Sequence, residues 1–170
     1  MRAVETAGGV AHGVDLNQDL VTGLKNVVVA QLPDIPMRTG AYDGTYCVLT
    51  LEHIQDHQYL FAEASRVVKG EGVMVLVMNH PTWTAPGSTP ITDYDGEILW
   101  RPGGYFTTGA TSIPAGNGEV TFYHRPMSEI LTSAAASGWR LVTMVEHPHH
   151  DLEDQAGIPR LLGCRWELTG

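Results

Sequence analysis

The chain has 170 residues, of which 43% are hydrophobic, a size that supports one globular domain with its own core and is short for two. Its 19 acidic residues outnumber its 10 basic ones, which gives a net charge of −9, and no basic stripe is visible. These values argue against nucleic acid as a partner and favour a small molecule.

The longest apolar runs, "NVVVAQL" and "GVMVLVM", are far shorter than the roughly 20 residues that a membrane-spanning helix needs. The first residues also lack the basic-then-apolar order of a signal peptide. We therefore expect a cytoplasmic protein that does not contact membranes. Cys47 and Cys164 fall in expected strands, where a thiol usually serves as a small buried apolar group, and no disulfide is expected in a reducing compartment.

From Val10 to Val77, short β-branched runs alternate with helical stretches, a pattern typical of βαβ units and a mostly parallel sheet. In the longer helical stretch the apolar residues recur at the spacing of one buried stripe, which predicts an amphipathic helix. Gly70 and Gly72 are expected to end that helix and allow the next turn. The predicted strands are 10–15, 26–30, 44–50 and 72–79, and the predicted helices are 17–24 and 55–69.

The stretch 80–126 carries six of the ten prolines and many aromatic side chains. A connection of this length is usually functional or disordered, and its aromatic content argues against disorder. Part of it is expected to form a hairpin that turns at "AGNG". We interpret 80–126 as a lid over the site within a single domain, 1–170, with a purely structural flap as the alternative.

The last third of the chain is expected to add a helix and two more strands. Met127, Ile130, Leu131 and Ala134 form an apolar helical face that stops at Gly138. The runs "WRLVTMV" and "RLLGCRWEL" that follow are expected to pair antiparallel at one edge of the sheet.

Ligands of open α/β sheets bind outside the carboxyl ends of the strands, and Asp15 falls at such an end. An acid there can accept hydrogen bonds from both hydroxyls of a ribose. Alternatively, Asp15 or Asn17 caps the helix that follows. The spacing alone leaves both interpretations open.

Five blocks carry a resemblance to a known family. "GVDLNQDL", "IPM", "YDGTYCVLTLEHIQDH", "EASRVVKGEGVMVLV" and "YHRPMSEILTSAAASGWRLVTMVE" resemble, in order and spacing, class I S-adenosylmethionine-dependent methyltransferases of the methyltransferase type 11 group. The resemblance covers nearly the whole chain from Val10 onward. It implies a Rossmann-like α/β fold, S-adenosylmethionine as cofactor, and methyl transfer to a small-molecule acceptor.

The resemblance also implies roles for individual residues. Asp15 matches the acid that holds the ribose hydroxyls, and Leu16 lies beside the adenine. Gln31 stands where the family usually has an acid for the adenine amino group, and its carbonyl accepts that hydrogen bond more weakly. Leu32 offers its backbone N–H and an apolar surface to the ring.

The strand that follows supplies the other cofactor positions in this resemblance. Cys47 and Val48 match residues that approach the methionine part of the cofactor. Asp43 matches an acid on the far side of the strand from the site, so we expect a structural role for it.

The run "TLEHIQDH" invites comparison with a metal site. Some quinone O-methyltransferases similar to this group hold a divalent metal with Glu-x-x-Glu-His, but Leu49 replaces the first glutamate here. We therefore expect no metal. In the preferred interpretation Glu52 favours the positive N-terminus of the helix and His57 lies on a solvated face.

Two histidines are candidates for a substrate-facing base. His53, with His80 as a second candidate, can take a proton from a hydroxyl or amine nucleophile. The run "HPHHD", 147–151, looks like a ligand cluster but lacks the spacing of a metal site, so we expect a solvated loop.

The resemblance lacks one part. Family members begin with a strand and a Gly-rich turn for the carboxypropyl end of the cofactor, whereas this sequence starts in what matches the following helix. That first strand is central in the family sheet, so its absence predicts two half-sheets with unpaired edges, which are costly when buried. We expect a truncated chain with impaired activity, or a sheet completed by re-pairing, a homodimer or a partner chain. The alternative function is a non-catalytic methyltransferase-like subunit; a dehydrogenase fits less well.

Overall fold

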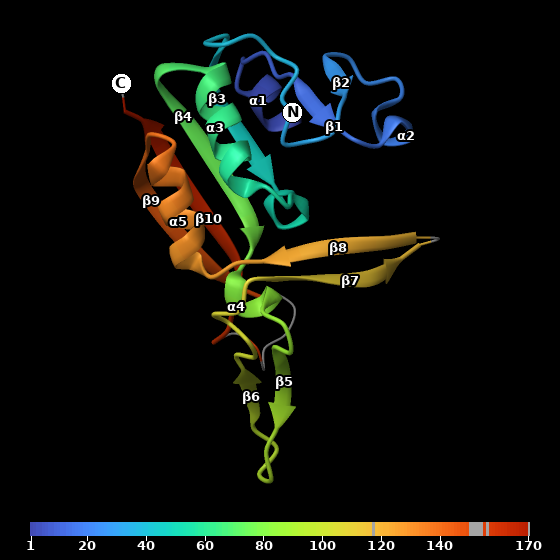
Figure 1. The fold of residues 1–170 in the computed structure, drawn as a ribbon. Helices are drawn as coiled ribbons and strands as arrows, with labels where there is room; N and C mark the ends of the chain where they lie inside the picture. The colour runs from blue at the N-terminus through green and yellow to red at the C-terminus, as the bar shows by residue number, and fades with distance from the viewer. Residues whose placement is uncertain (117, 150–154, 156, 170) are drawn as a thin grey trace.

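The computed structural model describes residues 1–116, 118–149, 155 and 157–169, and Figure 1 shows their arrangement. None of the described helices combines the length and hydrophobicity that crossing a bilayer requires. The elements, in chain order, are α1 (Arg2–Thr6), β1 (Gly13–Asp15), α2 (Gln18–Val21), β2 (Val27–Val29), β3 (Tyr42–Val48), the 3-10 helix η1 (Leu51–His53), α3 (His57–Val67), β4 (Val68–Asn79), α4 (Pro81–Thr84), β5 (Thr89–Thr92), β6 (Ile98–Arg101), β7 (Gly109–Ala115), β8 (Gly118–His124), α5 (Met127–Ala136), β9 (Trp139–Pro148) and β10 (Pro159–Leu168).

The main sheet has four strands in the order β3-β4-β10-β9. β3 and β4 run parallel, with Gly44 opposite Val73, whereas β10 is antiparallel to both of its neighbours. The expected α/β architecture, with an antiparallel pair at the C-terminal edge, is therefore confirmed.

A second, smaller sheet holds β1 and β2, which pair in parallel with Asp15 opposite Val29. Within the described part of the chain, β1 and β3 each have a hydrogen-bonded neighbour on one side only. Among these residues the two sheets are thus separate, and β1 and β3 each leave one backbone edge unpaired.

The hydrophobic core lies on one face of the main sheet, where α3 and α5 cover it (Figure 1). Side chains alternate along β4, so Met74, Leu76 and Met78 enter this core. Trp139 is 2% exposed, and its indole N–H donates to the Phe61 carbonyl at 3.1 Å, which fixes β9 against α3.

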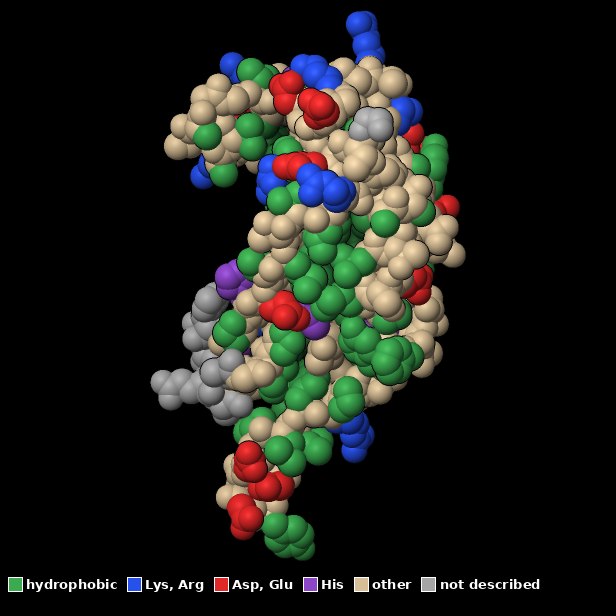
Figure 2. All heavy atoms as spheres, turned by 90° about the vertical axis from the view of Figure 1, so that its left-hand side faces the viewer, with side chains coloured by type: hydrophobic (Ala, Val, Ile, Leu, Met, Phe, Trp, Pro, Cys, Tyr) green, Lys and Arg blue, Asp and Glu red, His purple; other side chains and the backbone are tan. Residues whose placement is uncertain are grey.

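Hydrophobic side chains also remain at the surface of the main sheet. On β9, the outer strand, Leu141, Val142, Met144 and Val145 are exposed. Figure 2, which faces that side of the molecule, shows hydrophobic side chains gathered over its centre. Val48 at the end of β3 is exposed as well, so both outer strands present apolar groups.

The stretch 80–126 forms α4 and two hairpins that extend away from the main sheet (Figure 1). β5 and β6 make the first hairpin, and β7 and β8 make the second, in which Ala115 lies opposite Gly118, as the expected hairpin at "AGNG" requires. At the root of the first hairpin, the rings of Trp83 and Trp100 stack at 4.7 Å.

Candidate functional site

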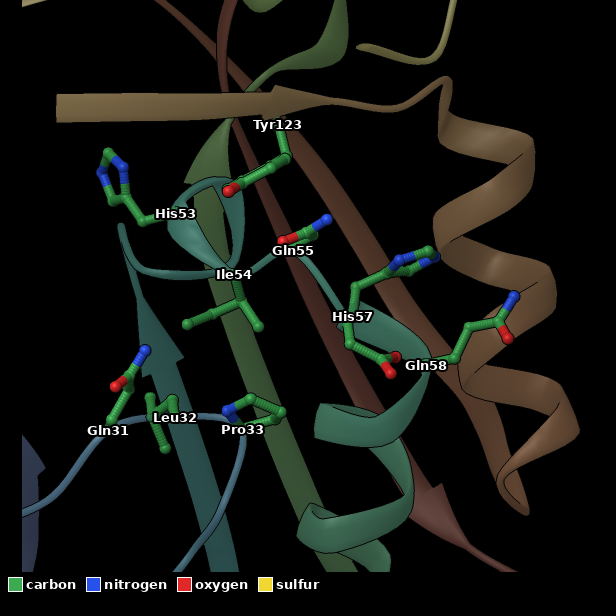
Figure 3. Close-up of a pocket in the computed structure, with 10 residues that line it drawn as sticks. Gln31, Leu32, Pro33, His53, Ile54, Gln55, His57, Gln58 and Tyr123 are labelled. Carbon is green, nitrogen blue, oxygen red and sulfur yellow. The ribbon is translucent and has the colours of Figure 1, made fainter. Parts of the chain in front are cut away.

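A cavity of about 620 Å³ lies where the end of β2, the loop after β3 and the end of β8 meet (Figure 3). Three segments far apart in the sequence therefore build one site. Its walls are formed by Gln31, Leu32, Pro33, His53, Ile54, Gln55, Asp56, His57, Gln58 and Tyr123.

Arg125, which follows β8 directly, holds the loop that carries most of these residues. Its side chain is buried, and Nη2 donates to the carbonyls of Ile54 at 2.5 Å and Gln55 at 2.7 Å. Nη1 donates to the Tyr123 carbonyl at 3.2 Å. Burial lowers the pKa of this guanidinium, while the nearby Glu129 and Asp56 favour its charged form and the carbonyl oxygens accept its hydrogen bonds.

His53 closes η1 and lines the cavity. Its Nδ1 lies 2.9 Å from the carbonyl oxygen of Thr121, and its ring meets the Phe122 ring edge-on with 4.5 Å between centroids. Both partners belong to β8, so the second hairpin determines where the imidazole of His53 sits.

His57 begins α3 and is only 6% exposed, so the expectation of a solvated face is wrong. Its Nε2 lies 3.0 Å from Ser133 Oγ and 3.5 Å from Glu129 Oε1, both on α5. Burial lowers the pKa of His57, and the charge of Arg125 lowers it further. The local sequence could not reveal this burial because it comes from the packing of a helix about 70 residues away.

Glu52 is likewise misplaced by the sequence interpretation. It is 1% exposed, and its Oε1 accepts hydrogen bonds from Asn79 Nδ2 at 2.5 Å and from the Asn79 backbone N–H at 3.2 Å. The carboxylate therefore ties η1 to the end of β4 and does not lie at the N-terminus of α3, where Asp56 is the cap.

No group of three or more His, Cys, Asp or Glu side chains is placed to hold a metal ion in the part of the chain that the structure describes. Of the "HPHHD" run, His150 and Asp151 lie outside the described residues.

Of the four residues expected around adenosine, Gln31 and Leu32 line the cavity. Asp15 ends β1, and its Oδ1 accepts a hydrogen bond from the backbone N–H of Asn17 at 2.8 Å. Asn17 in turn caps α2 by accepting from the Asp19 N–H at 2.9 Å. Asp15 thus stabilises its own turn and, like the exposed Leu16, stands outside the cavity wall.

Cys47 and Val48 end β3, and neither lines the cavity. Val48 is 49% exposed. Burial raises the pKa of the Cys47 thiol to about 12, and the nearby Glu52 adds to this shift. Cys47 therefore stays protonated, and both residues are suited to apolar contact with a ligand.

The geometry separates the two candidate bases, because His80 is 3% exposed and lies outside the cavity wall. Its Nδ1 accepts from the Thr82 N–H at 3.0 Å and so caps α4, while its Nε2 lies 2.8 Å from Glu146 Oε1. Burial lowers the pKa of His80. With both ring nitrogens engaged, His80 has a structural role, and His53 remains the candidate base.

The sequence interpretation missed Tyr123, His57, Gln55 and Gln58 among the residues of the cavity wall. The last three belong to the quoted run "TLEHIQDH" and its continuation, so closeness to His53 was a usable signal. Nothing local marks Tyr123, because only the return of β8 to η1 brings it to the site.

Comparisons with known proteins bear on the fold. Residues 1–76 match the family model of the methyltransferase domain, Methyltransf_11. No curated protein matches the chain.

Solved structures share the fold at low sequence identity. A proposed S-adenosylmethionine-dependent methyltransferase from Listeria monocytogenes superposes with a TM-score of 0.83 at 21% identity, over 99% of this chain and 86% of that one. An S-adenosylmethionine-dependent methyltransferase from Mesorhizobium loti also gives 0.83, at 19% identity, over 95% and 83%.

A third structure, the 1,6-didemethyltoxoflavin-N1-methyltransferase from Burkholderia thailandensis, contains 1,6-didemethyltoxoflavin and S-adenosylhomocysteine. It superposes with a TM-score of 0.61 at 12% identity, over 99% of this chain and 65% of that one. These comparisons confirm the expected fold: the chain shares the Rossmann-like fold of solved S-adenosylmethionine-dependent methyltransferases, and its residues 1–76 match the methyltransferase domain model.

Proposed function

We propose that the chain is a methyltransferase that moves the methyl group of S-adenosylmethionine to an oxygen, nitrogen or carbon of a small molecule. One observation carries this proposal: a single cavity joins Gln31 and Leu32, the positions implied for adenine, to His53, the candidate base. The 1,6-didemethyltoxoflavin bound in the Burkholderia structure supports a small-molecule acceptor.

The residues present fit the adenosine part of the cofactor. Asp15 lies opposite Val29 in the small sheet, so its carboxylate and Gln31 stand at the same end of adjacent strands. Gln31 offers a carbonyl that can accept from the adenine amino group, and Leu32 offers apolar surface. When bound, S-adenosylmethionine supplies a methyl group on a positively charged sulfur.

The chain's own residues position the acceptor and exclude water. Tyr123 and Ile54 form cavity walls, and Tyr123 comes from the stretch 80–126, which supports the lid role proposed for it. No covalent protein nucleophile is required. Most of the rate enhancement is therefore expected from aligning the methyl donor with the acceptor and from excluding water. His53 accepts the proton that the acceptor releases.

We also propose that this chain binds the cofactor weakly. Asp15 belongs to the small sheet and Val48 to the main sheet, and among the described residues no strand pairing joins these two sheets. The two halves of the cofactor would then rest on supports that are not hydrogen-bonded to each other.

Calorimetric titration with S-adenosylhomocysteine tests the proposal. Saturable heat that Asp15→Ala and Gln31→Ala each reduce would support it. Asp43→Ala is the matched control, because Asp43 is an exposed carboxylate at the far end of β3, paired with Lys69. No saturable heat from folded protein would overturn the proposal.

The second candidate is a non-catalytic subunit that acts through a homodimer or a partner chain. The open outer strands favour it, since exposed apolar side chains beside unpaired backbone groups promote strand pairing between chains. Sedimentation at several protein concentrations measures self-association. A lysine introduced by Val48→Lys on β3 or by Val145→Lys on β9 should prevent association if that strand forms the interface. A monomer throughout, with Thr92→Lys on β5 as the control, would exclude the homodimer.

A further inference from the structure

His53 makes a contact that determines where its ring proton resides. Its Nδ1 lies 2.9 Å from the backbone carbonyl oxygen of Thr121. A carbonyl oxygen can only accept a hydrogen bond, so Nδ1 carries the hydrogen and donates it. In the neutral ring the lone pair is then on Nε2, which has no hydrogen-bond partner within the described part of the chain.

The same hairpin holds the ring and the backbone around it. Phe122, the residue after Thr121, meets the imidazole edge-on at an interplanar angle of 61°. Arg125, just beyond the end of β8, donates to the carbonyls of Ile54 and Gln55, the two residues after His53. The tautomer, the ring plane and the loop thus depend on one element, β8, and on the arginine that follows it.

We propose that the hairpin β7–β8 sets the tautomer of His53, and that Nε2 is the atom that receives a proton from the methyl acceptor. This inference rests on the proposed function and narrows its substrate class. The acceptors are molecules with a hydroxyl or an N–H at the reacting atom, because such groups have a proton to release.

The proposed step balances in atoms and charge. The acceptor's lone pair forms a bond to the methyl carbon, and the carbon–sulfur bond breaks with its electron pair left on sulfur. The acceptor proton passes to His53 Nε2, which gives an imidazolium whose Nδ1–H still donates to the Thr121 carbonyl. The positive charge thus moves from the sulfur to His53, beside a carbonyl oxygen that stabilises it.

Long-range ¹H–¹⁵N NMR of the full chain tests the tautomer without cofactor or turnover. The His53 signals are assigned by their loss in His53→Gln. We expect the neutral ring to show Nδ1 as the N–H nitrogen and Nε2 as the unprotonated one. In water, neutral histidine favours the opposite tautomer, so a His53 spectrum with the proton on Nε2 overturns the proposal.

A change at the carbonyl tests whether β8 is the cause. Replacing Phe122 by its α-hydroxy acid turns the Thr121 carbonyl into an ester, a weaker acceptor, while the phenyl ring is kept. We expect the tautomer to shift toward Nε2–H. The same replacement at Phe106 weakens the Tyr105 carbonyl, which contacts His124 and not His53, and should leave the His53 tautomer unchanged. An unchanged His53 spectrum at position 122 overturns the role of the hairpin. Failure of cofactor binding appears only in the calorimetric titration, so the two failures are distinguishable.

Discussion

His57 on α3 and Ser133 on α5 are joined by a 3.0 Å contact between Nε2 and Oγ. Both residues are buried, and the contact lies where the two helices cover the core beside the cavity. A titratable group thus sits at the packing interface of two helices that are distant in sequence.

Acidification should therefore weaken the fold. Burial lowers the pKa of His57, so between its folded and unfolded pKa values the unfolded chain binds more protons. The stabilisation is full above about pH 6.5, the ordinary histidine value, and is lost as pH falls below it. Urea unfolding at pH 7.5 and 5.5 measures the effect.

In His57→Gln we expect a smaller loss on acidification and a cost of about 1–2 kcal/mol at pH 7.5 from the altered buried contact. His80, whose pKa burial also lowers, accounts for the part that remains. His147→Gln, which changes an exposed histidine on β9, should keep the full loss. A pH dependence identical in His57→Gln and the unaltered chain would contradict the assignment.

Glu63 predicts a second pH range in which the free energy of unfolding changes. Its carboxylate accepts from Arg66 Nε at 2.6 Å and Nη2 at 2.7 Å, and these hydrogen bonds lower the pKa of Glu63. Its contribution is present above the ordinary glutamate value of about 4.3 and is lost as pH falls through the folded pKa.

Because Arg66 also donates to the carbonyls of Ile35 and Met37, Glu63→Gln should loosen that loop. We expect a loss of roughly 1–3 kcal/mol in unfolding free energy at pH 7. The melting temperature of Glu63→Gln is compared with that of Glu119→Gln, which changes an exposed glutamate on β8. Equal melting temperatures for the two variants would contradict the prediction.

Gln31 offers a gain of affinity. An ionised carboxylate accepts a stronger hydrogen bond than an amide carbonyl, so Gln31→Glu should tighten S-adenosylhomocysteine binding by about fivefold, or ~1 kcal/mol. Gln58→Glu adds the same charge to the same cavity wall from α3 and is the matched control. If calorimetry gives the same change in affinity for both variants, the added negative charge alone explains it, and Gln31 does not contact the adenine.

The two cysteines should be unreactive in the folded chain. Burial raises the pKa of Cys47 to about 12 and that of Cys164 to about 11, so both thiols are protonated at pH 8. Since the thiolate is the nucleophile, alkylation should be slow until urea unfolds the chain. Mass spectrometry follows the labelling, and a thiol introduced by Thr92→Cys on exposed β5 should label quickly; equal rates at all three positions would refute the prediction.

The sequence predicted the order of the elements because each strand and helix has its own periodicity. The apolar stripe of α3 and the antiparallel β9–β10 pair were both confirmed. The boundary at Gly70 was less accurate, since α3 ends at Val67 and β4 begins at Val68 with an irregular register before Val73. Between Val68 and Val73 the chain leaves the register with β3, and Glu71 has a φ of 64°, so the expected turn lies within the bounds of β4.

The site was predictable where its residues are close in sequence. His53 and Gln31 both line the cavity, whereas burial of Glu52 and His57 depends on contacts with Asn79 and α5. Such contacts couple segments separated by 27 to 76 residues, and no local pattern encodes them. The cofactor roles of Asp15, Leu16, Gln31, Leu32, Cys47 and Val48 stay predictions, as does the role of His53 as a base.

The small sheet has a consequence for how ligand occupancy is controlled. β1 and β2 contribute three residues each, and a two-stranded sheet of that size is marginally stable in water. Its amide protons should exchange with deuterium by local opening long before those of β4 and β10, which unfold only with the whole domain. Asp15 would then be ordered for only part of the time. A molecule that binds between the two sheets and holds them together would therefore raise the affinity for S-adenosylmethionine without contacting it.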